Sequence, residues 1–334
     1  MPTAVILLSA VAIGCVPAAR LLASARWPRR SPAAAIALWQ ALGLSWGVAT
    51  VGALAGIGAT GLSRTVAGGT GADGPVLAGG RLAGVAAAAA DQATRLMLGS
   101  GGGPVRSWSV LTGLRAACLV AGAALLAVLC WILIAAITAV LRARHRQRAL
   151  LRLLAHGDPK VPGALVVDHP AAAAYCVPGL RSAIVISAGT LDLLDQAELA
   201  AVLAHERAHL RARHDLVLLP FTALLRAFRW SETARDANRE VALLVEMLAD
   251  DRARRLRPAR ELAMALLRVG AAGGGRAPVG ALAAAGATVD CELAARVTRL
   301  LRPQPGLSVI AMALLGAVAA FLVIAPAAAL LLPF

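Results

Sequence analysis

The sequence contains few charged and few aromatic residues for its length. Of 334 residues, 15% are charged, 3% are aromatic and 59% are hydrophobic, whereas soluble domains have about 25% charged and 45–50% apolar residues. This composition excludes disorder over most of the chain and disfavours an ordinary soluble globular protein. The scarcity of aromatic side chains also argues against stacking platforms for single-stranded nucleic acids.

Lysine and, in the first 150 residues, acidic side chains are nearly absent. Lys160 is the single lysine among 33 basic residues, and Asp73 and Asp91 are the only acids before residue 151. The net charge of +15 therefore comes from arginines, which in this first part flank apolar runs. Because this placement is typical of membrane topology, we expect a membrane protein and no direct binding of nucleic acid.

The cysteines offer no framework of disulfide bonds or thiolate ligands. Their number is odd and none of them forms a CxxC pair, so we expect them to pack as small side chains. They are Cys15, Cys118, Cys130, Cys176 and Cys291.

Four apolar runs are long enough to cross a bilayer, which needs about 20 mostly apolar residues. They cover about 3–25, 33–62, 116–141 and 307–333. No basic residue precedes the first run, so it does not resemble a cleaved signal peptide. The fragment GIGATG, from Gly56 to Gly61, matches a dinucleotide fingerprint but lacks the strand–turn–helix context. The GxxxG pair of Gly52 and Gly56 instead predicts close helix packing.

Arginines between the runs predict the orientation, because short cytoplasmic loops carry an excess of basic residues. Loop 26–30 contains three arginines, residues 142–148 contain four, and two more precede the last run. We therefore expect residues 142–302 to form one cytoplasmic domain and the Gly-rich segment 64–115 to form a loop outside. The prediction is a multi-pass α-helical protein of the plasma membrane, in contact with the lipid bilayer.

The segment 142–302 begins with short β-like stretches separated by turn signals. They are Ala164–Val167, Ala173–Val177 and Ala183–Ser187. A helix is then predicted from Gln196 to about Arg213. Asp195 is its expected N-cap, with Glu198 as the capping-box partner. This mixture of strands and helices predicts an α+β domain.

The predicted helix contains HERAH, an instance of HExxH that runs from His205 to His209. Residues four apart share a helix face, so both imidazoles can bind one metal ion. Glu206 would take a proton from a water whose pKa zinc lowers to about 7. The motif predicts a zinc-dependent metalloendopeptidase with one Zn²⁺ per chain.

A third ligand does not follow directly after the motif. A metzincin would need Gly and His where the chain has Ala212 and Asp215. His214 is five residues beyond His209, about 140° round a continuous helix. We therefore expect His214 to face solvent rather than the metal.

A second predicted helix, over residues 238–256, supplies the remaining candidates. Glu246 and Asp250 are four residues apart and share one face, whereas Asp251 lies off that face. Glu246 can serve as the third ligand, and Asp250 can orient a zinc-binding imidazole. The alternative for Asp250, Asp251 and Arg252 is a solvated, salt-bridged helix face.

These motifs carry a resemblance to known families. The stretch IVISAGTLDLLDQAELAAVLAHERAHLRARHD, followed by EMLADDRA, resembles the membrane-embedded zinc metallopeptidases of the BlaR1/MecR1 type (peptidase family M56). More distantly, it is similar to the Ste24/HtpX group, whose ExxxD element falls on Glu246 and Asp250. The resemblance covers about residues 150–300 and the flanking spans. The zinc ligands that it implies are His205, His209 and Glu246, with Glu206 as the general base.

The resemblance also implies a fold and a role. The fold is a cytoplasmic zincin domain of the gluzincin-like type between the third and fourth spans. The role is cleavage of a protein in regulatory signalling, with a transcriptional repressor as the substrate. Antibiotic-sensing relatives carry a penicillin-binding domain after the last span. This sequence stops at Phe334 without such a domain, so direct sensing of β-lactams stays an open question at this point.

Three further features each have a functional and a packing interpretation. The apolar segment Leu216–Leu225 is too short to span, and it either dips into the membrane or forms a buried helix kinked at Pro220. Tyr175 either stabilises an oxyanion or packs. Ala183–Ser187 is the expected edge strand that holds an extended substrate by β-addition.

Two other functions are compatible with parts of the sequence. A site-2-type intramembrane protease would place HExxH in an apolar span, but Arg207, Arg211 and Arg213 crowd the motif. A non-catalytic signalling or scaffold protein with a metalloprotease-like fold is the other alternative. The intact set of candidate ligands argues against it.

Overall fold

A computed structural model of the chain describes residues 2–59, 110–159, 161–179, 182–272, 286–302 and 304–331. It contains two compact units. The first comprises Met1–Leu21, Gln40–Trp131 and Leu314–Phe334, and the second comprises Leu22–Trp39 and Ile132–Ala313. The predicted outside loop, 64–115, lies almost entirely outside the described residues.

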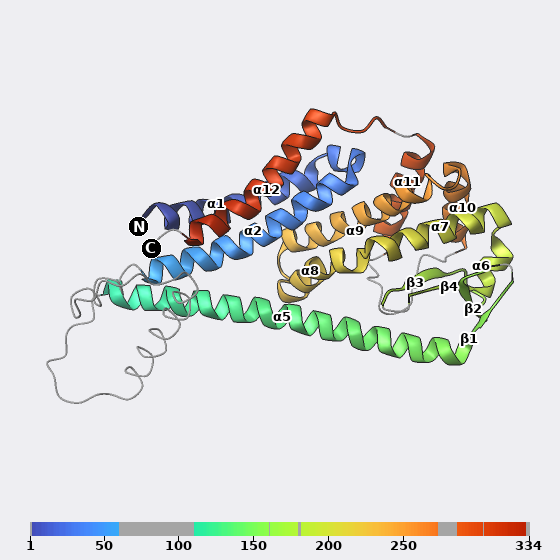
Figure 1. Ribbon diagram of the computed structural model, residues 1–334, viewed down its shortest axis with the longest axis horizontal. Helices are drawn as coiled ribbons and strands as arrows, with labels where there is room; N and C mark the ends of the chain where they lie inside the picture. The colour runs from blue at the N-terminus through green and yellow to red at the C-terminus, as the bar shows by residue number, and fades with distance from the viewer. Residues whose placement is uncertain are drawn as a thin grey trace. The chain divides into compact units, whose positions relative to one another are not determined.

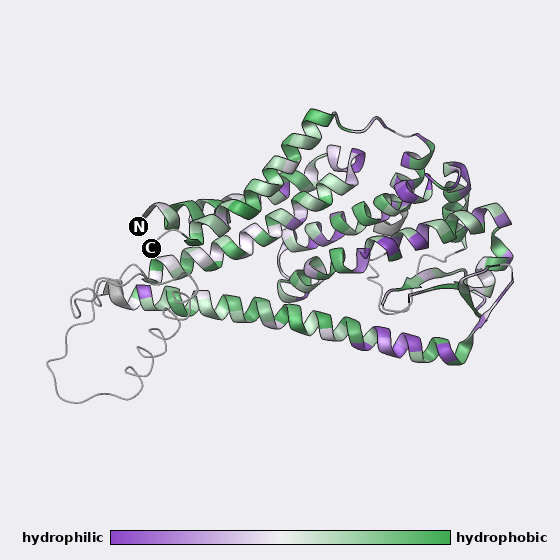
Figure 2. Ribbon diagram, viewed as in Figure 1, coloured by the Kyte–Doolittle hydropathy of each residue, from purple (hydrophilic) through white to green (hydrophobic). Residues whose placement is uncertain are grey.

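Four long apolar helices account for the predicted spans (Figure 1). They are α1 (Pro2–Ser24), α2 (Pro32–Ala59), α5 (Val110–Leu154) and α12 (Val309–Leu331). All four are long and apolar enough to cross a membrane. In Figure 2 green predominates along these helices, with pale stretches in α2 and purple turns near the start and toward the end of α5. The chain is thus mostly helical, with the long apolar helices expected of a membrane protein.

Helix α5 extends beyond the apolar run that we predicted to end at residue 141. It continues through the arginine-rich segment RARHRQR to Leu154. Arginine, alanine, glutamine and leucine all favour helix, and neither glycine nor proline interrupts this stretch. The predicted domain boundary at residue 142 therefore falls inside one helix, whose polar C-terminal part is visible in Figure 2.

In the first unit, Gly52 of the predicted GxxxG pair lies at a close approach of helices. A Cβ atom at Gly52 would lie 2.7 Å from Cδ2 of Leu330 and 3.2 Å from Cδ1 of Leu8, so a larger residue would require these leucine side chains to move. Gly122 of α5 likewise lies where a Cβ would be 3.1 Å from Leu54. The first four residues of GIGATG belong to α2 rather than to a phosphate-binding turn.

The second unit contains a small mixed sheet. Its strands are β1 (Ala155–Gly157), β2 (Ala164–Val167), β3 (Ala174–Val177) and β4 (Ala183–Ser187). The three predicted strands are therefore confirmed, and β1 is additional. The order is β1-β2-β4-β3. Strands β2 and β4 are parallel, whereas β1 pairs with β2 and β3 pairs with β4 in antiparallel fashion.

This strand order corrects one prediction. Strand β4 is paired on both sides, so its backbone groups are used within the sheet and it has no free edge for a substrate. Strand β3 lies at the edge instead. The hydrophobic run Ala183–Ser187 is buried in four of its five positions, which suits a central strand better than an edge strand.

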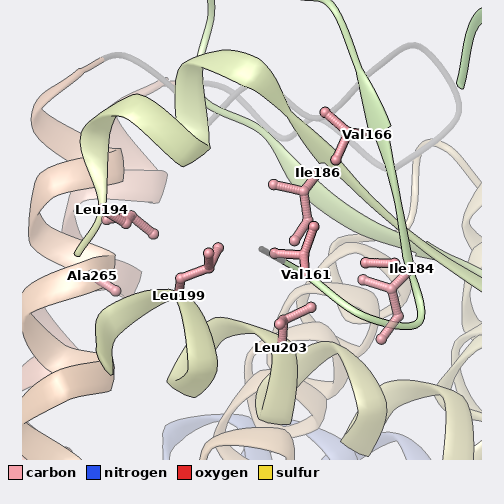
Figure 3. Close-up of a cluster of buried hydrophobic side chains, with 9 residues drawn as sticks. Val161, Val166, Ile184, Ile186, Leu194, Leu199, Leu203 and Ala265 are labelled. Atoms are coloured by element: carbon pink, nitrogen blue, oxygen red, sulfur yellow. The ribbon is translucent and has the colours of Figure 1, made fainter. Parts of the chain in front are cut away.

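After the sheet, the second unit contains helices α6 (Ala188–Leu193), α7 (Gln196–Ala212), α8 (His214–Ala227), α9 (Glu232–Ala253), α10 (Ala259–Ala271) and α11 (Gly286–Leu301). Helices α6, α7 and α10 pack on one face of the sheet, and α8, α9 and α11 pack against other helices of the unit. Figure 3 shows Leu199 and Leu203 of α7 directed toward Ile184 and Ile186 of β4. This cluster fixes α7 across the sheet.

The opposite face of the sheet has a separate core, in which Leu151, Val177 and Val185 are buried. Tyr175 packs against this cluster. Since Tyr175 pairs with Val185 and Cys176 pairs with Ile184, alternation along β3 places these two side chains on opposite faces. Tyr175 therefore packs on the face away from α7, and its oxyanion role finds no support.

Candidate metal centre

Helix α7 begins at the predicted N-cap. The Asp195 side chain accepts a hydrogen bond from the Glu198 backbone N–H at 2.8 Å, and the Glu198 carboxylate accepts one from the Asp195 N–H at 3.1 Å. This reciprocal capping box satisfies two otherwise unpaired donors. Glu198 also pairs with Arg268 of α10 at 3.1 Å. The start of α7, and hence the angular position of its histidines, is fixed by these contacts.

Helix α9 is capped by Ser231, whose hydroxyl accepts a hydrogen bond from the Ala234 backbone N–H. It starts earlier than the predicted residue 238 because Ser231 provides a cap in a region that periodicity alone does not mark. Residues Val241, Leu244 and Val245 are fully buried, and α9 packs against both α7 and α8. This packing brings Glu246 and Asp250 to the histidines of α7.

His205, His209 and Glu246 form a group that could hold one metal ion. The two Nε2 atoms lie 3.0 Å apart, and the Glu246 carboxylate oxygens lie 3.3 Å from His205 Nε2 and 3.5 Å from His209 Nε2. Ligand atoms held about 2.0–2.2 Å from a tetrahedral zinc ion are about 3.3–3.6 Å from one another. The two separations that involve Glu246 match this range, and the two imidazole nitrogens, at 3.0 Å, would move apart slightly around a zinc ion. The three side chains could thus hold one ion, with a fourth position for water or substrate.

Asp250 lies behind this group. Its Oδ1 is 2.9 Å from Nδ1 of His205, which leaves Nε2 directed toward Glu246. A carboxylate on the far nitrogen of an imidazole fixes the ring and increases its basicity as a ligand. Both side chains are buried, and Asp250 is only 1% exposed. The predicted pairing of Asp250 with an imidazole is thus present in the structure.

The electrostatics of the group favour a cation. Burial disfavours a charged His205, but the contacts with Asp250 and Glu246 outweigh it and raise the pKa of His205 to about 10. Burial likewise opposes ionisation of Glu246, but Arg296 and the two histidines hold the pKa of Glu246 well below its ordinary value. Surroundings that favour a proton on His205 would favour a divalent ion for the same reason.

Arg296 of α11 is a site residue that the sequence did not reveal. Its guanidinium contacts Asp250 through Nε at 2.9 Å and through Nη2 at 2.8 Å, and its Nη1 lies 3.0 Å from Glu246. A bidentate arginine–carboxylate pair is strong and directional. Nothing in the sequence around Arg296 distinguishes it from the other arginines of the chain, because its partners lie 46 and 50 positions earlier.

Glu206 lies beside His205 on α7 and is partly buried. Cys176 of β3 faces α7, where its thiol lies close enough to the Glu206 carboxylate to be affected by it. Burial, together with the negative charge of Glu206, raises the pKa of the Cys176 thiol well above its ordinary value. Cys176, for which we expected only a packing role, therefore lies beside the expected general base.

The prediction that His214 faces solvent is wrong. Its side chain is buried, with 2% exposure for the residue, and its Nδ1 lies 3.0 Å from Nδ1 of His209. The prediction assumed a continuous helix, but α7 ends at Ala212 and Arg213 adopts the left-handed conformation, with φ 50° and ψ 44°. The chain turns there, and α8 begins with His214 directed back at the motif.

The remaining predicted positions have plain structural roles. Asp251 lies away from the histidines and pairs with Arg299 at 2.7 Å and with Arg254 at 3.2 Å, so the predicted separation of Asp251 from Asp250 is observed. Residues Leu216–Leu225 belong to α8, which continues through Pro220 and packs against α9. Entry of this segment into a membrane remains a prediction.

Two histidines four apart on one helix, a glutamate from a second helix and an acid beside the first histidine are typical of zinc metallopeptidases. Comparison with known families agrees with this class. Residues 140–253, about a third of the chain, match the model of Peptidase family M48, a family of zinc metallopeptidases that includes Ste24 and HtpX. No curated protein and no solved structure matches the chain. The more distant of the two resemblances is therefore the one that the comparison supports.

Proposed function

We propose that this chain is a zinc-dependent membrane endopeptidase that cleaves a protein at the cytoplasmic face of the plasma membrane. The observation that carries the proposal is the convergence of His205, His209 and Glu246, with Glu206 adjacent on α7. The M48 match over residues 140–253 supports the same activity. The membrane location rests on the four long apolar helices, and the cytoplasmic orientation rests on the arginine bias.

In this proposal each residue of the centre has one task. His205, His209 and Glu246 would hold the zinc, which when bound supplies Lewis acidity toward a peptide carbonyl and toward water. Glu206 would accept a proton from the attacking water and return it to the leaving amine. Asp250 holds the His205 ring, and Arg296 neutralises the carboxylates that surround it.

The substrate would bind in extended form along β3. This strand lies at the sheet edge, packs against α7, and places Cys176 beside Glu206. Addition of a peptide to such an edge uses main-chain hydrogen bonds and tolerates many sequences. The identity of the substrate as a transcriptional repressor, and a role in regulatory signalling, rest on the resemblance to the BlaR1/MecR1 type (family M56).

The test compares protein N-termini in cells that express the wild type, Glu206→Gln or the control Glu232→Gln. Glu232 is an exposed acid at the start of α9, with 82% exposure of its side chain. We expect new N-termini with the wild type and the control but not with Glu206→Gln, because loss of a general base costs about 10²–10⁴-fold. New N-termini that persist in Glu206→Gln would contradict the proposed mechanism. A repressor among the cleaved proteins would support the signalling role, and its intact recovery from wild-type cells would contradict it.

A further inference from the structure

An arginine-lined pocket lies within the second unit, separate from the metal centre. Its volume is about 1080 Å³, and it is formed by the loop between α1 and α2, by α9 and α11, and by the segment before α12. Six arginines line it, and the one carboxylate is that of Asp251. They are Arg26, Arg29, Arg30, Arg254, Arg299 and Arg302.

The internal contacts leave most of this charge unmatched. Asp251 is occupied by Arg299, at 2.7 and 2.8 Å, and by Arg254 at 3.2 Å. Among the described residues, no carboxylate lies within 4.0 Å of Arg26, Arg29 or Arg302, although the charge of Arg29 still acts on Glu240 of α9. The pocket thus has five more positive than negative side chains, and like charges gathered in this way repel one another unless an anion joins them.

Hydrogen bonds connect the segments that form the wall of the pocket. The 3-10 helix η1 (Trp27–Arg30) contacts α9. The Arg299 Nε donates to the Arg29 carbonyl at 2.7 Å, and the Arg30 Nε donates to the Pro305 carbonyl at 3.1 Å. These bonds tie together backbone segments that are about 270 positions apart in the sequence, and they hold the arginines around one space.

The pocket residues lie close in sequence to the ends of the apolar helices, which indicates a ligand from the membrane. Helix α1 ends at Ser24, α2 begins at Pro32 and α12 begins at Val309, so three of the four apolar helices end or begin within a few residues of the pocket. Trp27 also lines it, and tryptophan is enriched where a membrane meets water. A basic pocket beside such helix ends suits the head groups of anionic lipids.

We propose that this pocket binds the phosphate head group of an anionic membrane lipid. Guanidinium groups bind phosphate oxygens through paired N–H donors, and the acyl chains would remain in the bilayer. The proposal rests on the membrane location proposed above but not on peptidase activity. An experiment can therefore contradict lipid binding and still support peptidase activity, or support lipid binding and contradict peptidase activity.

The test measures lipid retention by the full-length protein, purified in a zwitterionic detergent, with native mass spectrometry. Phosphatidylglycerol, phosphatidylcholine and soluble glycerol phosphate are titrated in parallel. The pocket variant is Arg26→Gln/Arg29→Gln/Arg302→Gln. The matched control is Arg142→Gln/Arg146→Gln/Arg152→Gln, which removes three exposed arginines of α5, and thermal unfolding verifies that both variants are folded.

We expect the wild type and the control to bind phosphatidylglycerol, and the pocket variant to bind it roughly 100-fold more weakly. This figure follows from about fivefold for each arginine near an anionic head group. Equal losses in both variants would overturn the proposal, because they would reflect general surface charge. Equal binding of phosphatidylcholine would overturn it as well. Binding of glycerol phosphate without binding of phosphatidylglycerol would assign the pocket to a soluble ligand and contradict a lipid site.

Discussion

Nδ1 of His209 lies 3.0 Å from Nδ1 of the buried His214. For His209 to offer the lone pair of Nε2 to a metal, its proton must be on Nδ1, from which it donates to His214. His214 must then be neutral and accept this hydrogen bond at Nδ1, with its own proton on Nε2. In this state the 3.5 Å approach of Arg252 Nη1 to Nε2 is not a hydrogen bond. Burial, together with the nearby His209, lowers the pKa of His214 to about 3, so His214 is neutral at physiological pH and can orient the His209 ring.

Substitution of His214 should therefore weaken zinc binding although His214 is not a ligand. We expect His214→Ala to lower zinc affinity about 10–100-fold, as the loss of a group that orients a ligand does. Competition with a chelator of known affinity measures this change. The control is His156→Ala, which removes an exposed histidine of β1 and should leave affinity unchanged. Equal affinity in both variants would exclude an orienting role for His214.

Arg296 should contribute to the free energy of unfolding as well as to the arrangement of the metal ligands. Its removal takes the bidentate partner from Asp250, which is 1% exposed, and one ion-pair contact from the partly exposed Glu246. Loss of one partner of a buried ion pair costs roughly 3–5 kcal/mol, so we expect Arg296→Met to reduce the free energy of unfolding by about this amount. Chemical denaturation measures it, with the exposed Arg235→Met as the control. Unchanged stability of Arg296→Met would show that these charges interact weakly.

Glu240 on α9 provides a prediction on pH that is independent of the metal. Burial raises the pKa of Glu240 above its ordinary value, and Arg29 and Arg239 offset this only in part. The folded chain thus binds a proton on Glu240 more tightly than the unfolded chain does. Its contribution to stability is present below the unfolded pKa and is lost as the pH rises through the folded pKa.

Glu240→Gln carries no charge at any pH and should avoid this loss. We expect its thermal midpoint to exceed that of the wild type at pH 7 and to match it below about pH 4, where the glutamate is protonated in both states. Thermal unfolding at the two pH values measures the difference, with Glu232→Gln as the exposed control. A midpoint for Glu240→Gln that is lower than the wild type at pH 7 would mean that the arginine contacts of Glu240 outweigh its burial.

Features with a local signal in the sequence were predicted well. The capping box at Asp195 and Glu198 is observed, because both partners lie within one helical turn. The same holds for the spacing of four that places Glu246 and Asp250 on one face of α9. Strands β2, β3 and β4 were found because short runs of hydrophobic residues between turn signals are governed by neighbouring positions.

Features that depend on distant contacts or on one backbone angle were missed. The orientation of His214 depends on the left-handed Arg213, an uncommon conformation for a residue other than glycine. The central position of β4 depends on which strands pair, and hydrophobicity alone does not fix strand order. Arg296 reaches the site because α11 packs against α9. No sequence motif predicts this packing.

The native Cys291 gives a direct test of the predicted orientation. It is an exposed cysteine of α11, in the segment expected to be cytoplasmic. We expect a membrane-impermeant maleimide to label it only after cells are permeabilised, whereas Ser100→Cys, in the segment expected outside, should be labelled in intact cells. Loss of labelling in Cys291→Ser would show that the maleimide reacts with Cys291 and not with another cysteine. Labelling of Cys291 in intact cells would reverse the proposed topology.

The zinc content of the purified full-length protein tests the central claim most directly. We expect one zinc ion per chain in the wild type and in Asp251→Ala, because Asp251 pairs with arginines away from the histidines. Glu246→Ala should lose most of its zinc, since it removes one of the three converging ligands. A wild-type protein without zinc, or Glu246→Ala that retains one tightly bound zinc ion while Asp251→Ala loses it, would contradict this account of the metal centre.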